Sequence, residues 1–251
     1  MTEPTSSGAN ADLSPADASP AASSPAKASV WEDFIDIFYA PSAVFARRIS
    51  SGFLIPMLVV TIAGGVLYLV NSNVMSQVMD AEMSRALAKQ SRTLTPEQIE
   101  GARKIGATMG KIGVFVFAPI IMFLTGLALW VVGKFFEAKQ TLGQAVMVAS
   151  YSYIPRIVEG VVTSVQGLLL DPAQFTGRWR ISLGAARFLD PDTTSPALLA
   201  LLGRIDVFTI WITVLLVIGL SVTGKIPRAK AAIAGVIVWF LGAVPLLLQA
   251  R

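Results

Sequence analysis

One hydrophobic stretch, residues 141–170, is long enough to cross a bilayer yet carries two charged residues, Arg156 and Glu159. A charge inside a membrane span costs about 2.5–3.5 kcal/mol on insertion scales, so it is usually paired and marks a functional or structural need. The two residues are three positions apart, which places them on one face of a helix within reach of each other. Pro155 directly precedes them and removes a backbone donor, so we expect a kink there. The stretch therefore predicts a membrane helix that contains a polar site.

The rest of the chain has the composition of a membrane protein. Of its 251 residues, 54% are hydrophobic and 14% are charged, whereas soluble domains average about 25% charged residues. The chain has no cysteine and no histidine, which excludes thiol nucleophiles, disulfides and the usual zinc ligands. The net charge of +4 is modest and is what Lys and Arg at membrane edges produce, so it does not indicate nucleic-acid binding.

Hydropathy predicts an all-α fold, a polytopic membrane helix bundle with five transmembrane helices and a disordered N-terminal tail. The tail, residues 1–29, is built almost wholly from Ala, Ser, Pro, Thr, Asp and Gly, which cannot form a core. A membrane domain, residues 30–251, follows it. Its uncharged or nearly uncharged apolar runs have the length of a bilayer crossing; they lie at about residues 53–70, 112–133, 141–170, 207–223 and 231–248.

The segments between the spans also carry recognisable signals. Residues 30–49 place aromatic and acidic residues on a helical period and predict an amphipathic lead-in helix at the membrane surface. Residues 74–111 form a helical extramembrane loop, in which Thr95, Pro96 and Gln98 predict a capped helix start that runs on into the next span. Residues 171–204 form the second long loop.

The orientation follows from the basic residues of the short turns, because long loops cross a membrane regardless of their charge. The turns after the second and fourth spans and the segment before the first span are basic; their charges are Lys134, Lys139, Lys225, Arg228, Lys230, Arg47 and Arg48. This places the N-terminus in the cytoplasm and, with five spans, the C-terminus on the opposite side. Arg103, Lys104 and Lys111 lie on the other side, in a long connection that also contains acidic residues.

Three segments resemble the Yip family of integral membrane proteins, in a bacterial-type form. They are FIDIFYAPSAVFARRI at 34–49, GQAVMVASYSYIP at 143–155, and IDVFTIWITVLLVIGLSVTGKIPRAKAAIAGVIVWFL at 205–241. The resemblance covers about residues 30–248 in the right order. It implies five spans with a cytoplasmic N-terminus, and for a bacterial-type member it implies the inner (cytoplasmic) membrane. The eukaryotic Yip and Yif relatives are implicated in vesicle traffic through Rab GTPases, but the family defines no catalytic residues.

The candidate polar site is centred on the third predicted span. Its members are Arg156, Glu159, Pro155, Tyr151, Tyr153, Gln144 and Asp206. One interpretation is a polar site between helices that lines a water-filled cavity. The other is a structural ion pair, or a pair that reaches toward one membrane surface. Asp206 either reaches Arg156 or caps its own helix, where a carboxylate is favoured.

Three classes of function follow. We favour an integral membrane adaptor or organiser that acts through protein and lipid contacts. The alternative is a small-solute transporter or channel with its polar site at Arg156 and Glu159, because many transporters build sites from interrupted spans. An intramembrane enzyme would need two facing carboxylates, and no phosphate-loop, HExxH or GxSxG motif is present. We therefore expect no enzyme, no catalytic or metal-binding residues and no cofactor. We expect the lipid bilayer and either a protein partner or a second copy of the chain as partners, and no nucleic acid.

Overall fold

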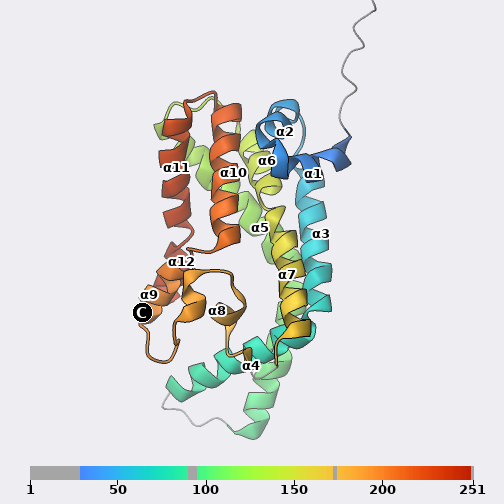
Figure 1. Cartoon of the computed structure of the whole chain (residues 1–251), viewed down its shortest axis with the longest axis vertical. Helices are drawn as coiled ribbons and strands as arrows, with labels where there is room; N and C mark the ends of the chain where they lie inside the picture. Colours follow the sequence, from blue (N-terminus) through green and yellow to red (C-terminus); the bar gives the residue numbers. More distant parts are fainter. Residues whose placement is uncertain (1–28, 90–94, 172–173, 250–251) are drawn as a thin grey trace, which may run out of the picture.

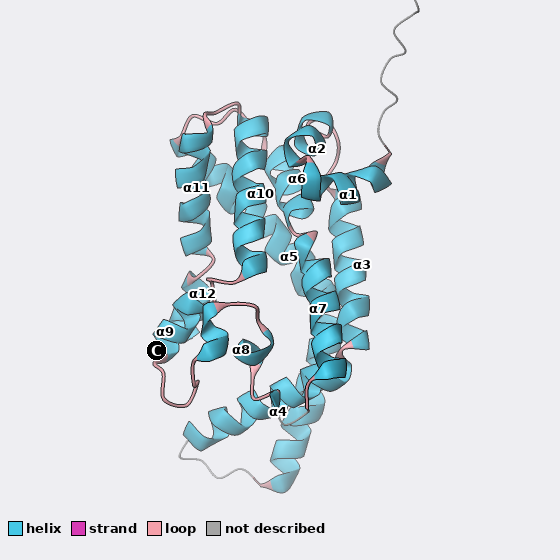
Figure 2. Cartoon of the chain, in the orientation of Figure 1, coloured by secondary structure: helices cyan, strands magenta, loops and turns pink. Residues whose placement is uncertain are grey.

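The computed structural model describes residues 29–89, 95–171 and 174–249 (Figure 1). Within these ranges the chain is helical and has no strand, although an isolated bridge joins Gly184 to Asp206 (Figure 2). The predicted all-α membrane bundle is therefore confirmed. The predicted tail, except for Ser29, lies outside the described residues.

The helices follow the predicted segments in order. They are α1 (Val30–Tyr39), α2 (Pro41–Arg47), α3 (Leu54–Val70), α4 (Ser72–Lys89), α5 (Pro96–Phe135), α6 (Leu142–Ser152), α7 (Pro155–Leu169), α8 (Arg178–Ile181), the 3-10 helix η2 (Ala185–Phe188), α9 (Pro196–Leu202), α10 (Val207–Gly224), α11 (Arg228–Leu241) and α12 (Val244–Gln249). The predicted lead-in helix corresponds to α1 and α2, which meet at Ala40 because Pro41 begins the second.

Local capping signals set the starts of three of these helices. Thr95 and Gln98 form a capping box, in which each side chain accepts from the other residue's backbone, and Pro96 stands in the first turn of α5. From there α5 runs for 40 residues without interruption, so the prediction that this helix continues into the second span is confirmed. Thr141 with Gln144 caps α6, and Ser29 with Glu32 caps α1, in the same way.

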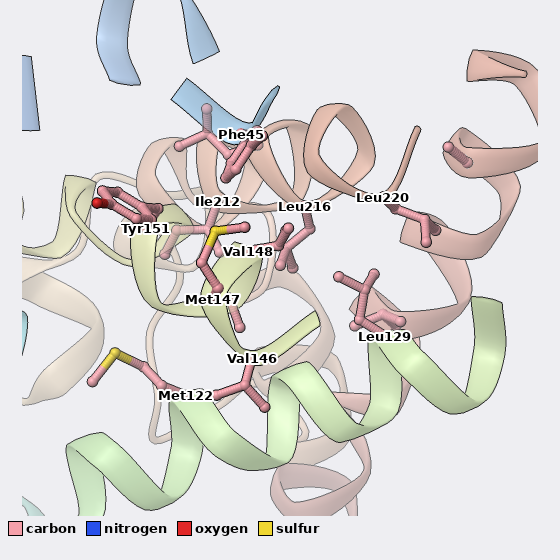
Figure 3. Close-up of a cluster of buried hydrophobic side chains, with 14 of the residues drawn as sticks. Phe45, Met122, Leu129, Val146, Met147, Val148, Tyr151, Ile212, Leu216 and Leu220 are labelled. Atoms are coloured by element: carbon pink, nitrogen blue, oxygen red, sulfur yellow. The ribbon is translucent and has the colours of Figure 1, made fainter. Parts of the chain in front are cut away.

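Helix α6 lies at the centre of the bundle. Every residue from 145 to 152 is buried, and α6 packs against α1, α3, α5 and α10. Figure 3 shows side chains from four helices meeting in this core: Phe45 of α2, Met122 and Leu129 of α5, Val146, Met147, Val148 and Tyr151 of α6, and Ile212, Leu216 and Leu220 of α10. The core therefore joins the short N-terminal helices to the long ones.

The outer surface of the bundle is apolar, as lipid contact requires. On α3 the side chains of Leu54, Leu58, Ile62 and Val66 are each more than half exposed. Their spacing of four places them on one stripe of the helix. A soluble protein does not leave contiguous apolar stripes of this kind uncovered. The stripe therefore faces the hydrocarbon of the membrane.

Fewer helical stretches than the predicted five have the length and composition of a membrane span. By length and composition three helical stretches could cross a bilayer, namely Pro96–Phe135, Val207–Gly224 and Arg228–Leu248. A fourth is added if α3 and α4, which are bent by 77°, are taken as one. The predicted third span is divided into α6 and α7, of 11 and 15 residues, and neither reaches the length of about 20 that a straight crossing needs. All five apolar segments are helical. The first forms a helix of only 17 residues, α3, and the third is divided between α6 and α7.

The contact between α5 and α6 depends on a glycine. A Cβ added at Gly126 would lie 2.6 Å from Val146 Cα and 2.9 Å from Val146 N, and backbone atoms cannot turn aside. We expect Gly126→Ala to lower the free energy of unfolding by about 1–3 kcal/mol, the usual effect of overpacking. Thermal unfolding in detergent measures it. Gly64→Ala is the matched control, since no atom lies within 4 Å of its added Cβ; equal melting temperatures for the two variants would contradict the close packing.

Candidate functional site

The site begins at the break between α6 and α7. Tyr153 and Ile154 separate the two helices, and Pro155 occupies the first turn of α7. Because proline has no N–H, it cannot continue the hydrogen-bond ladder of α6, and it suits the first turn of a new helix. The chain crosses the gap with turn hydrogen bonds, from Ile154 N to Tyr151 O at 3.2 Å and from Arg156 N to Tyr153 O at 3.0 Å. Arg156 is thus placed at the start of α7.

Arg156 pairs with Glu159 as the sequence spacing allows. Its Nη1 donates to Glu159 Oε2 along α7, and its Nη2 donates to Thr209 Oγ1 of α10 at 3.3 Å. The two charged side chains are 37% and 29% exposed at the bundle surface. The guanidinium therefore satisfies Glu159 and also ties α7 to α10.

The neighbouring polar residues have structural contacts of their own. The hydroxyl of Tyr153 lies 3.1 Å from the hydroxyl of Thr125 on α5. Asp206 is buried and caps α10, accepting from Phe208 N at 3.0 Å and Thr209 N at 3.3 Å. Its second oxygen accepts from Leu183 N at 3.0 Å, which holds the preceding loop against the helix start. Of the two roles that the sequence left open, the geometry thus gives Asp206 the cap.

Removal of the Asp206 carboxylate should be costly because three backbone donors lose their acceptor. We expect Asp206→Ala to lower the free energy of unfolding by about 2–3 kcal/mol, more than the ~1 kcal/mol of an ordinary N-cap. Chemical denaturation in detergent provides the measurement. Ser195→Ala removes the exposed cap of the short helix α9 and serves as control. If both variants lose the same free energy of unfolding, the hydrogen bond from Leu183 N to Asp206 does not contribute to stability.

Two of the predicted site residues lie away from Arg156. Gln144 caps α6 and donates from Nε2 to Ile49 O at 3.1 Å, on the segment after α2. Tyr151 is buried and donates from its hydroxyl to Asp33 Oδ2 of α1 at 3.1 Å. Both residues thus hold the N-terminal segment to the bundle and do not contact the Arg156 pair.

Asp33 is the centre of a second polar cluster that sequence reasoning missed. Its side chain is completely buried, yet it accepts from Arg47 Nε at 2.6 Å, from Arg48 Nε and from the Tyr151 hydroxyl. We call these four residues the Asp33 clamp. A signal was present in the sequence: Asp33 shares a helical face with Ile37, which is also fully buried. That spacing places Asp33 on the packed side of α1 and not on its polar side.

Asp36 extends the clamp at the surface. Arg47 Nη2 donates to Asp36 Oδ2 at 2.5 Å, so Arg47 bridges two carboxylates of α1. Burial alone would lower the pKa of the Arg47 guanidinium, but hydrogen bonds to Asp36 and Asp33 outweigh it and raise the pKa above its ordinary value. Arg47 therefore carries its charge at any physiological pH. Its ion pairs join α1 to α2.

The two clusters hold neighbouring helices in position. Within residues 29–89, 95–171 and 174–249, no group of three or more Asp or Glu side chains is placed to hold a metal ion. The charges of the clamp and of the Arg156 pair are matched by hydrogen-bond partners within the bundle.

Comparison with known proteins identifies the family. The family model described as the Yip1 domain matches residues 35–249, which is most of the chain. The chain belongs to the Yip1 family. The Yip1 domain here contains every helix from α2 to α12, and its match begins inside α1, two residues after Asp33. No curated protein and no solved structure matches the chain.

Proposed function

We propose that this Yip1 protein is an integral membrane adaptor or organiser, which works through protein and lipid contacts and neither transports a solute nor catalyses a reaction. The observation that carries the proposal is the α1 helix. Its inner face is held by the Asp33 clamp, while Trp31, Ile35 and Tyr39 on its other side are 71%, 64% and 84% exposed. A surface that is apolar and firmly held in place is suited to contact something outside the bundle.

The direction of α1 supports contact at the membrane surface. Figure 1 shows α1 lying crosswise at the upper end of α3, whereas α3, α10 and α11 run along the bundle. Trp31, Ile35 and Tyr39 recur at every fourth position and so form one stripe. Trp and Tyr favour the boundary between headgroups and hydrocarbon, because their rings are apolar and their N–H or O–H is polar. The stripe would therefore meet lipid headgroups or a partner's membrane segment.

The proposed orientation places α1 in the cytoplasm and the C-terminus on the opposite side of a bacterial cytoplasmic membrane. The two basic turns lie together, because Lys139 N donates to Gly224 O at 2.9 Å and Lys230 Nζ to Glu137 Oε2 at 3.2 Å. Figure 1 places these turns at the same end of the bundle as α2. Short basic turns favour the cytoplasmic side, which supports this orientation.

The alternative, a small-solute transporter or channel, has one observation in its favour. The break between α6 and α7 leaves Arg156 and Glu159 partly exposed in the middle of an apolar segment, and transporters place substrate sites at such breaks. Against it, both charges are already used, by each other and by Thr209. A solute would have to displace those contacts before it could bind.

Flux through reconstituted protein separates the two functions. The full chain is placed in sealed liposomes, and the entry of a panel of neutral, cationic and anionic solutes is followed by osmotic swelling. An organiser should give the same rates as protein-free liposomes, before and after Glu159→Gln. Saturable entry that Glu159→Gln abolishes would establish the transporter.

A crosslinking experiment tests the α1 surface itself. A photoreactive phenylalanine analogue at Tyr39 should give discrete lipid or protein adducts in native membranes. Phe135, which ends α5 and is 81% exposed, provides the matched control. The same adducts at both positions, or none at Tyr39, would count against α1 as the contact surface.

A further inference from the structure

A pocket of about 260 Å³ is lined by residues of the connection between α7 and α10. Figure 1 shows this connection at the end of the bundle away from the basic turns. Its lining includes Gly177, Trp179, Arg180, Arg187 and Asp190, which come from α8, η2 and the loops beside them. The volume would hold one phosphate-sized group with its immediate substituents. It contains neither member of the Arg156 pair and none of the Asp33 clamp.

The arginines that line the pocket differ from the nearby Arg85 in their ion pairing. Arg85, next to Gly177, pairs with Glu82 and Asp192. In the part of the chain that the structure describes, neither Arg180 nor Arg187 forms an ion pair. Arg187 donates to neutral oxygens, those of the Gln166 side chain at 2.9 Å and the Ser182 carbonyl at 3.4 Å.

The charged side chains that line the pocket sum to a net charge of one positive unit. Arg180 and Arg187 contribute two positive charges and Asp190 one negative charge, and Asp190 uses its Oδ1 to accept from Asp192 N at 2.9 Å. A phosphodiester carries one negative charge and would balance the sum. Guanidinium groups match phosphate oxygens with parallel N–H donors, the strongest kind of hydrogen bond available to a protein surface.

Apolar residues beside the pocket indicate where such a phosphate comes from. Phe188 stands between Arg187 and Leu189 in the sequence and is 84% exposed. Leu168 and Leu169, at the end of α7 to which Arg187 is bound through Gln166, are also strongly exposed. The acyl chains of a lipid would bury these apolar side chains, whereas a small soluble phosphate ester would leave them exposed to water.

We propose that this pocket binds the phosphodiester headgroup of an anionic phospholipid, with Arg180 and Arg187 on the phosphate and Phe188 beside the acyl chains. The site is at the opposite end of the bundle from α1. It does not depend on the proposed function, since a transporter would have the same pocket.

Native mass spectrometry of the full chain in neutral detergent tests the proposal. Phosphatidylglycerol and phosphatidylcholine are titrated in parallel, because they share the phosphodiester and acyl chains but differ in net charge. We expect the wild-type chain to bind phosphatidylglycerol about tenfold more tightly, which corresponds to about 1.4 kcal/mol. Arg180→Gln, at an exposed residue, should remove most of that preference. Arg187→Lys keeps the charge and should retain part of it.

Two controls make the result decisive. Arg228→Gln removes an exposed arginine at the other end of the bundle and should leave the preference unchanged. Unaltered melting of Arg180→Gln confirms that the loop still folds. Equal affinity for both lipids, or an equal loss in Arg180→Gln and Arg228→Gln, would overturn the proposal. Displacement of phosphatidylglycerol by an equal concentration of glycerol 3-phosphate would overturn it too, because the pocket would then be a site for a soluble phosphate ester.

Discussion

Replacing Asp33 by alanine is expected to lower the free energy of unfolding by about 3–5 kcal/mol, the usual cost of removing one partner of a buried ion pair. The Asp33 side chain is fully buried, and Arg47 and Arg48 are only 28% and 17% exposed. The change takes the acceptor from three donors at once, the two guanidinium groups and the hydroxyl of Tyr151. The two guanidinium charges then remain poorly solvated without their buried partner, and α1 loses its hydrogen bond to Tyr151 of α6.

Thermal unfolding of the detergent-solubilised chain measures this loss. Asp36→Ala is the matched control, because Asp36 also binds Arg47 but is 38% exposed, and exposed ion pairs contribute about 0–1 kcal/mol. Asp33→Ala should melt well below Asp36→Ala. Similar melting temperatures for the two variants would mean that the clamp does not hold the N-terminal helices in place.

The second large effect concerns Arg156 and Glu159. Each single change to alanine leaves a lone charge within an apolar segment, and we expect each to lower the free energy of unfolding by about 2–3 kcal/mol. That is below the full buried-pair cost because both side chains are partly exposed. The double change removes both charges and should therefore be less damaging than either single change.

A double-mutant cycle in detergent measures the coupling between the two residues. The single variants, the double variant and the wild-type chain are unfolded under one set of conditions. Thr209→Val adds a separate test, since it removes the Thr209 hydroxyl that accepts from Arg156 but leaves the ion pair. If the loss of unfolding free energy in the double variant equals the sum of the two single losses, the residues are not coupled and the structural role of the pair fails.

The sequence was informative where structure is local. Hydropathy located the helical segments, and the residues at 95, 96 and 98 located the start of α5, because a capping box involves only neighbours. Pro155 predicted a disturbance in the third span. The span is in fact divided into two helices, α6 and α7. This division depends on how the two helices pack against α3, α5 and α10, and the sequence of the span alone does not contain that information.

The polar clusters were harder to predict because their partners are far apart in the chain. Arg156 and Glu159 are one helical turn apart, so their pairing could be read directly. Asp33 lies 118 residues from Tyr151, and nothing local relates them. For the same reason Tyr151 was assigned to the site of Arg156, its neighbour in sequence, whereas α6 turns its hydroxyl toward α1.

Cysteine accessibility at the break between α6 and α7 tests whether the Arg156 pair is a dry structural element of a membrane organiser. The chain has no native cysteine, so single cysteines from residue 150 to residue 162 can each be probed with membrane-impermeant thiol reagents from either side. Ala229→Cys and Thr193→Cys, at exposed positions near opposite ends of the bundle, are the reactive controls. We expect the controls to react while the scanned positions stay silent. Reaction on a helical period beside Arg156 and Glu159 would contradict it, because water would then reach the pair and a solute pathway would explain the break better.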